Sequence, residues 1–169
     1  FDDKIIIRLL ADDNYYLNLL PAADSGIRGL FDVFAKWFND TTYRPVPTFH
    51  LAVEQFLFGA KPSVFHFFNL FYYALLGMLL FYTFIKFKLF DAKWPIFLTV
   101  LFFLIHSSHA NIVASIKNRD VILAMLYGVL FIHFAAEFLK QKKIGTFLFS
   151  ILSISAAMLC NCLLYTSPS

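Results

Sequence analysis

Cysteine is scarce in this chain of 169 residues, which contains only Cys160 and Cys162. Two cysteines so close together cannot form a disulfide framework, and there is no second cysteine pair to build a zinc site. Charged residues are also few, at 15% of the chain, and no basic stripe with interleaved aromatic residues is present. The sequence therefore gives no reason to expect a nucleic acid as a partner.

The chain has more apolar residues than a soluble domain of its length. Hydrophobic residues make up 60% of it, aromatic residues 20%, and the mean hydropathy is +0.69. A soluble domain of this length cannot bury so much apolar surface, so a membrane must cover part of it. The 23 phenylalanines are spread along the chain as lipid-facing and packing side chains. We therefore predict an all-α fold, a polytopic bundle of transmembrane helices.

Four apolar stretches predict about four spans, at residues 64–85, 92–106, 121–139 and 144–161. The first has 22 residues without a charge, or ~33 Å of helix, which matches a hydrocarbon core of ~30 Å. The second leads into a polar segment that starts at His106, so it is expected to leave the lipid there. These spans place the bundle at residues 64–161.

The two short joints between spans, residues 86–93 and 140–143, are rich in lysine and should be cytoplasmic by the positive-inside rule. Residues 1–63 carry eight acidic and six basic residues, a net charge of −2 against +5 for the remainder. We expect residues 1–63 to form an extracytoplasmic loop on the same face as residues 106–120. Within the loop, Pro45 and Gly59 bound an expected interfacial helix, whose apolar stripe would be Phe49, Val53, Phe56 and Leu57.

Both ends of the chain carry signs of truncation. It begins at Phe1 without a methionine, which indicates a truncated reading frame. With residues 1–63 on the extracytoplasmic face, a cytoplasmic natural N-terminus requires an odd number of spans upstream, and one is the simplest case. Residues 162–169 resemble the translation of a transposase sequencing adapter, and we expect them to form a tail outside the natural fold.

Two acidic pairs lie near the start of the chain, Asp2–Asp3 and Asp12–Asp13. A carboxylate pair at a membrane surface can supply a general base or a metal ligand. The alternative is a solvated loop, and spacing alone does not choose between the two pairs.

Basic and imidazole side chains provide further candidates. Arg44 begins the expected interfacial helix, and its planar donor fork suits a phosphate, although pairing within the loop is the alternative. His106 and His109 would share one helix face, where they would line a polar cavity or bind a metal. No third ligand stands at diagnostic spacing, so no cofactor is assigned and a divalent metal stays open. The isolated polar residues are expected to pack or hydrogen-bond within the bundle: His50, Glu54, His66, Asn69 and His133.

Several segments, in this order, resemble one family: FDDKIII (1–7), YRP (43–45), LAVEQFLFG (51–59), HFFNL (66–70), HSSH (106–109) and ASIKNRDVILA (114–124). Together they resemble the membrane half of protein O-mannosyltransferase relatives in the GT-C superfamily, which carry C-terminal tetratricopeptide repeats. The chain departs from the family pattern at residues 106–109, where His-Pro-x-His is usual. It also breaks off at Asn161, where a Lys-Glu pair begins in the family, and the repeats are absent.

The resemblance implies a multi-pass enzyme of the bacterial inner membrane or the endoplasmic reticulum. It would transfer a sugar, a hexose such as mannose, from a polyprenyl-phosphate donor to a protein or glycan hydroxyl on the extracytoplasmic face. Asp2 or Asp3 would be the base, Arg44 and secondarily Arg119 would hold the phosphate, and His106 and His109 would line the site. A transporter, flippase or repeat-bearing scaffold is the alternative, but a transporter should carry ionisable groups near mid-span, and these spans lack them.

Overall fold

The computed structural model describes residues 44–59, 61–88, 90 and 92–160, and this part of the chain is helical without a strand. Its elements are α3 (Pro45–Phe58), α4 (Pro62–Lys86), α5 (Lys93–Ile105), α6 (Ser107–Ala114), the 3₁₀ turn η2 (Ile116–Asn118), α7 (Arg119–Gln141) and α8 (Ile144–Cys160). The predicted all-α fold class is confirmed. The expected loop before residue 44 and the tail 162–169 lie outside the described residues.

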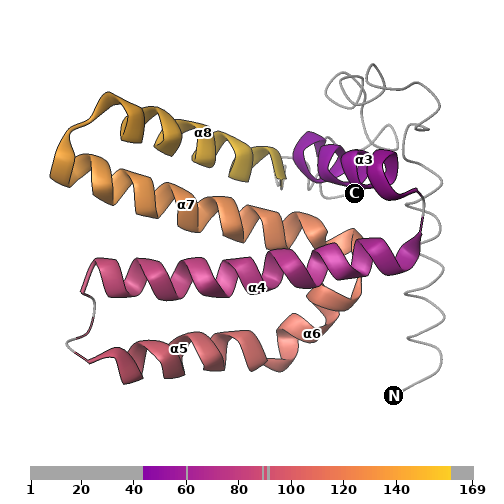
Figure 1. The fold of residues 1–169 in the computed structure, drawn as a ribbon, viewed down its shortest axis with the longest axis horizontal. Helices are drawn as coiled ribbons and strands as arrows, with labels where there is room; N and C mark the ends of the chain where they lie inside the picture. Colours follow the sequence, from indigo (N-terminus) through magenta and orange to yellow (C-terminus); the bar gives the residue numbers. More distant parts are fainter. Residues whose placement is uncertain (1–43, 60, 89, 91, 161–169) are drawn as a thin grey trace, which may run out of the picture.

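Four helices run alongside one another, and α3 lies at one end of them (Figure 1). Helix α7 packs against both α8 and α4, and α4 packs in turn against α5. Helix α3 contacts α4, α7 and α8, while α6 turns the chain back from α5 towards α7. The α4–α5 and α7–α8 joints lie together at the opposite end of the molecule from α3 (Figure 1).

The larger of two buried apolar clusters lies where α4, α7 and α8 meet, and the smaller joins α3, α4 and η2. We call the larger one the core. Its side chains are Tyr73, Leu76, Ile122, Leu123, Leu126 and Cys160. Most of the large apolar side chains elsewhere on the helices are exposed. The segments Pro62–Lys86 and Ile116–Gln141 are long and apolar enough to cross a membrane, and only 28% and 22% of their most apolar windows are buried. An apolar helix that is mostly exposed suits lipid better than the core of a soluble protein.

Helix α5 lies within the second predicted span, residues 92–106, and is short. Helix α5 has 13 residues, or ~20 Å at 1.5 Å per residue, and the extended backbone of His106 ends it. The Tyr73 hydroxyl donates to the Leu104 carbonyl at 2.9 Å and so satisfies one acceptor at this helix end. The chain then continues as α6 in a new direction (Figure 1). That the four long helices cross a membrane stays a prediction.

Helix α3 has the predicted limits, since Pro45 opens it and Gly59 follows its last residue with a φ of 77°. Phe56 and Leu57 of the predicted apolar stripe are exposed, and the placement of α3 in a membrane interface stays a prediction. The face that packs inwards instead carries Leu51 and the polar side chains of Thr48 and Glu54. Glu54 faces inwards because it bonds to Tyr72 on α4 and Arg119 on α7, while the Thr48 hydroxyl donates to the Arg44 carbonyl at the start of α3.

Glycine 77 lets α4 approach α5 closely. A Cβ atom added there would lie 2.7 Å from Leu104 Cδ1, whereas one added at Gly128 on α7 would meet nothing within 4 Å. We predict that Gly77→Val lowers the free energy of unfolding by about 1–3 kcal/mol through overpacking. Gly128→Val, the matched control, should change it by less than about 0.5 kcal/mol. Unfolding by SDS in mixed micelles would measure both variants, and equal losses would contradict close packing at Gly77.

Candidate functional site

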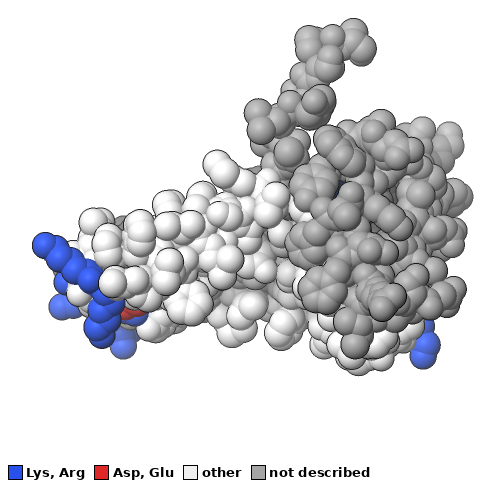
Figure 2. Space-filling model, turned by 90° about the horizontal axis from the view of Figure 1, so that it is seen from above, with Lys and Arg blue, Asp and Glu red and all other residues white. Residues whose placement is uncertain are grey.

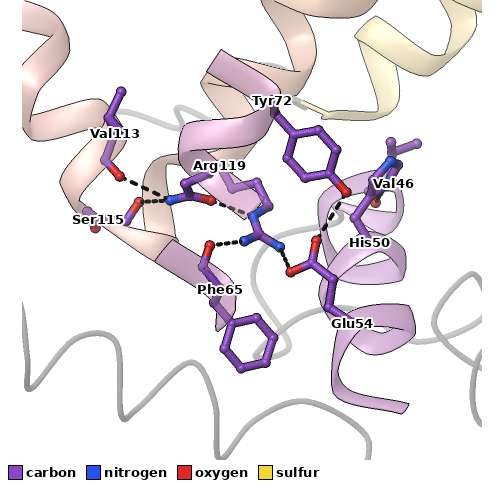
Figure 3. A network of polar contacts seen from close by, with 9 residues as sticks. Val46, His50, Glu54, Phe65, Tyr72, Val113, Ser115 and Arg119 are labelled. Carbon is purple, nitrogen blue, oxygen red and sulfur yellow. Dashed lines mark hydrogen bonds and ion pairs between the residues drawn. The ribbon is translucent and has the colours of Figure 1, made fainter. Parts of the chain in front are cut away.

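Polar side chains from α3, α4 and α7 meet at the α3 end of the molecule, around the guanidinium of Arg119 (Figure 3). Arg119 is the first residue of α7 and is buried. Its Nη1 donates to Glu54 Oε2 on α3 at 2.6 Å, and its Nη2 donates to the Phe65 carbonyl on α4 at 2.7 Å. Its Nε donates to Asn69 Oδ1 at 2.6 Å. One side chain thus joins the three helices.

Asn69 extends this network to the bend between α6 and η2. Its Nδ2 donates to the carbonyls of Ser115, at 3.0 Å, and Val113, at 3.3 Å (Figure 3). The last carbonyls of a helix lack partners within that helix, so an amide from α4 satisfies them. The side chain of Asn69 is fully buried and uses both its donor and its acceptor groups here.

Glu54 balances the charge of Arg119. It is 3% exposed, and its Oε1 accepts a hydrogen bond from the Tyr72 hydroxyl at 3.1 Å (Figure 3). Burial raises the pKa of the Glu54 carboxyl, while the Arg119 charge and the hydrogen bonds from Arg119 and Tyr72 oppose that rise. The aromatic rings of Tyr72 and Phe65 also lie over the guanidinium, with centroids at 5.7 and 5.9 Å from its carbon.

His50 lies one turn before Glu54 on α3, with both ring nitrogens close to polar atoms. Its Nδ1 lies 3.1 Å from the Val46 carbonyl, which can only accept, so Nδ1 carries the proton. Its Nε2 is then free to accept from the Tyr127 hydroxyl at 3.5 Å. Burial lowers the pKa of His50, and the charge of Arg119 lowers it further against the effect of the Val46 hydrogen bond.

Arg44 and Asp120 form a second ion pair beside the first. Arg44 Nη1 lies 2.5 Å from Asp120 Oδ2, and the side chains are 32% and 8% exposed respectively. The Val121 amide donates to Asp120 Oδ1 at 2.8 Å, which fixes the carboxylate at the start of α7. Arg44 therefore keeps contact with solvent, whereas Asp120 is buried. A small pocket of about 20 Å³ adjoins the pair and is lined in part by Thr48, Leu51 and Lys117, with room for about one water molecule.

The two predicted histidines lie at the bend after α5. His106 is exposed, and its ring centroid is 6.1 Å from that of His109. The His109 ring packs on Phe103 at 4.7 Å and on Tyr73 at 5.8 Å, and its buried Nδ1 has no hydrogen-bond partner. Within the described residues, no group of three or more His, Cys, Asp or Glu side chains is placed to hold a metal ion.

The structure thus brings together two of the predicted site residues, Arg44 and Arg119, through neighbouring ion pairs. Asp2, Asp3, Asp12 and Asp13 lie outside the described residues. That Arg44, Arg119, His106 and His109 bind a substrate stays a prediction. Sequence reasoning treated Glu54 and Asn69 as isolated, and it missed that both serve Arg119. A signal was available, because a buried amide in an apolar helix needs a polar partner.

Two curated proteins match the chain, and both are described as Protein O-mannosyl-transferase TMTC1. The mouse protein (Mus musculus) is 32% identical over 108 residues, which cover 61% of this chain and 11% of that protein. The human protein (Homo sapiens) is 32% identical over 124 residues, or 69% of this chain and 14% of that protein. The chain therefore spans well under a fifth of the length of these relatives. No protein-family profile and no solved structure matches it.

Arg119→Met should destabilise the protein strongly, because it leaves the Glu54 carboxylate buried without its counter-charge. We expect a loss of about 3–5 kcal/mol in the free energy of unfolding. Arg119→Lys keeps the charge but not the three-nitrogen fork, so its loss should be smaller but still clear. SDS unfolding in mixed micelles would measure both.

The double variant Arg119→Met with Glu54→Gln provides the control. Neutralising Glu54 removes the stranded charge, so the double variant should be more stable than Arg119→Met alone. Additive losses from the two single changes would contradict a direct ion pair.

Proposed function

We propose that this chain is part of a membrane glycosyltransferase that moves a sugar, a hexose such as mannose, from a polyprenyl-phosphate donor to a hydroxyl of a protein or glycan acceptor. The observation that carries the proposal is the 32% identity to two proteins described as protein O-mannosyl-transferases. At a coarse level this similarity supports a membrane glycosyltransferase. The donor, the acceptor and the face of the membrane are our inference.

The proposed topology has α4, α5, α7 and α8 crossing the membrane, with α3 and the Arg119 network on the extracytoplasmic face. Helix α5 is too short to cross ~30 Å of hydrocarbon by itself, so α6 would complete that crossing after the bend at His106. Non-helical backbone is tolerated at such depth where protein lines it. The Asn69 amide, bonded to the Ser115 carbonyl, would serve that purpose.

Arg44 is the residue we assign to the donor phosphate. It is partly exposed, and a guanidinium binds phosphate oxygens through two parallel hydrogen bonds. Its present partner is Asp120, so a donor phosphate would compete with that carboxylate for the same nitrogens. The neighbouring Lys117, on the same small pocket, would add positive charge.

Arg119 is better suited to positioning than to donor contact. Each of its three nitrogens already donates to a protein acceptor, and its side chain is 1% exposed. By holding α3 against α4 and α7, it would fix Arg44 at the mouth of the site. The general base would be Asp2 or Asp3, which would take the proton of the acceptor hydroxyl as the sugar–phosphate bond breaks.

The assignment of Asp2 or Asp3 as the general base is tested in the protein encoded by the full natural reading frame. We expect Asp2→Asn or Asp3→Asn to lower kcat about 100-fold or more, because the acceptor proton loses its base. Transfer of labelled mannose from polyprenyl-phosphate mannose to a peptide acceptor would be measured in reconstituted vesicles. Asp12→Asn and Asp13→Asn are the matched controls and should retain activity. Normal transfer by both Asp2→Asn and Asp3→Asn would rule out the assignment.

The assignment of Arg44 to the donor phosphate is tested by comparing variants of Arg44 and of its ion-pair partner Asp120. Arg44→Gln should raise the KM for the donor about tenfold to a hundredfold, the value of a charged hydrogen bond of about 1.5–3 kcal/mol. Asp120→Asn should leave donor affinity unchanged or higher, because it removes the competing carboxylate and keeps the guanidinium. If Asp120→Asn weakened the donor as much as Arg44→Gln, the pair would be purely structural.

A further inference from the structure

The end of the molecule opposite the Arg119 network is strongly basic. Its lysines come from the two joints and the adjoining helix ends: Lys86, Lys88, Lys93, Lys140, Lys142 and Lys143. Basic side chains gather there on the surface, with little acidic surface among them (Figure 2). Against the six lysines, the sequence of this end offers only Asp91 and Glu137, so its net charge is +4.

Two of these lysines have partners within the protein. Lys86 forms an ion pair with Glu137, and its Nζ also lies 3.4 Å from His133 Nε2. The Nζ of Lys140 lies over the Phe87 ring, 4.7 Å from its centroid. For Lys88, Lys93, Lys142 and Lys143 the described part of the chain provides no ion pair. Most of the positive charge at this end is therefore not balanced within the described part of the chain.

Two of the lysines stand where glycine would be the usual residue. Lys88 and Lys142 both have a φ of 51°, and Lys142 caps α7 in the left-handed conformation. Side chains other than glycine and asparagine are disfavoured there. The helix dipole favours a cation at the end of a helix, but it does not require the left-handed backbone that these two lysines adopt.

Lys93 stands at the edge of an aromatic groove. The groove has a volume of about 220 Å³ and is lined by Phe81 of α4 and by Lys93, Trp94 and Phe97 of α5. The Trp94 side chain is 73% exposed, and its ring meets Phe97 edge to face at 6.0 Å. Lys93 also begins α5, where the helix dipole disfavours a cation and the first turn contains no acid. An anion bound at Lys93 would relieve that conflict.

We propose that this end is a binding site for an anionic phospholipid, whose phosphate contacts Lys93 and whose acyl chain lies in the groove formed by Phe81, Trp94 and Phe97. Exposed tryptophan beside lysine is typical of the headgroup level of a membrane. Clustered lysines next to a span attract anionic lipid, at about 1 kcal/mol for each residue near the surface. The Lys93 ammonium suits the phosphate of such a lipid, and the apolar groove beside it suits the acyl chain. The proposal does not depend on the transfer activity.

Trp94 can report on the lipid directly, because brominated acyl chains quench tryptophan fluorescence on contact. The chain has two tryptophans, so Trp37→Phe would be the common background. The 169-residue chain would be reconstituted in phosphatidylcholine nanodiscs, with either brominated phosphatidylglycerol or brominated phosphatidylcholine added in equal amounts. We expect the anionic lipid to quench Trp94 at lower content, and rising ionic strength to reduce this preference.

Three variants make the test specific. Lys93→Gln should weaken the preference for the anionic lipid about fivefold, whereas Lys93→Arg should keep it. Lys61→Gln, which removes a lysine at the other end of α4, should match the parent. Circular dichroism would check that helix content is unchanged. Equal quenching by the two lipids, equal behaviour of Lys93→Gln and Lys93→Arg, or an equal loss in Lys61→Gln would each overturn the proposal.

Discussion

The buried charge of Arg119 is the constraint on which the described structure depends most. Taking an ion out of water costs several kcal/mol, and that cost is recovered only if partners surround the ion with good geometry. Here the partners come from separate segments: Glu54 from α3, and Asn69 and the Phe65 carbonyl from α4. The positions of three helices are therefore fixed by the requirements of one side chain. The small apolar core between α4, α7 and α8 could not impose that arrangement with the same precision.

The sequence was sufficient to predict features set by local rules. The helical fold follows from long apolar runs, and the limits of α3 follow from Pro45 and Gly59. The side-chain partners were not predictable in the same way. Arg119 is 65 residues from Glu54 and 50 from Asn69, and helical periodicity describes only the faces of a single helix. The packing face of α3 was missed for the same reason, since its polar Glu54 faces inwards to partners on α4 and α7.

The two ends of the bundle handle charge in different ways. At the α3 end, the described residues include two buried or half-buried ion pairs, Arg119–Glu54 and Arg44–Asp120, and Asn69 is bonded to backbone carbonyls. At the lysine-rich end, ammonium groups outnumber carboxylates, and most are left at the surface. Helix α4, with 25 residues, separates these environments by ~37 Å, several times the Debye length of ~8 Å at physiological ionic strength. Solvated charges at one end should therefore have little effect on the other.

Arg119 and Asp120 are consecutive, yet they bind opposite ends of α3: Glu54 near its last turn and Arg44 at its start. The order of the charges gives α3 a polarity. If the helix lay in the reverse direction across α7, arginine would face arginine and carboxylate would face carboxylate, and both contacts would be repulsive. Two neighbouring residues thus determine the direction in which α3 lies across α7. They select one of two orientations that apolar packing alone would distinguish poorly.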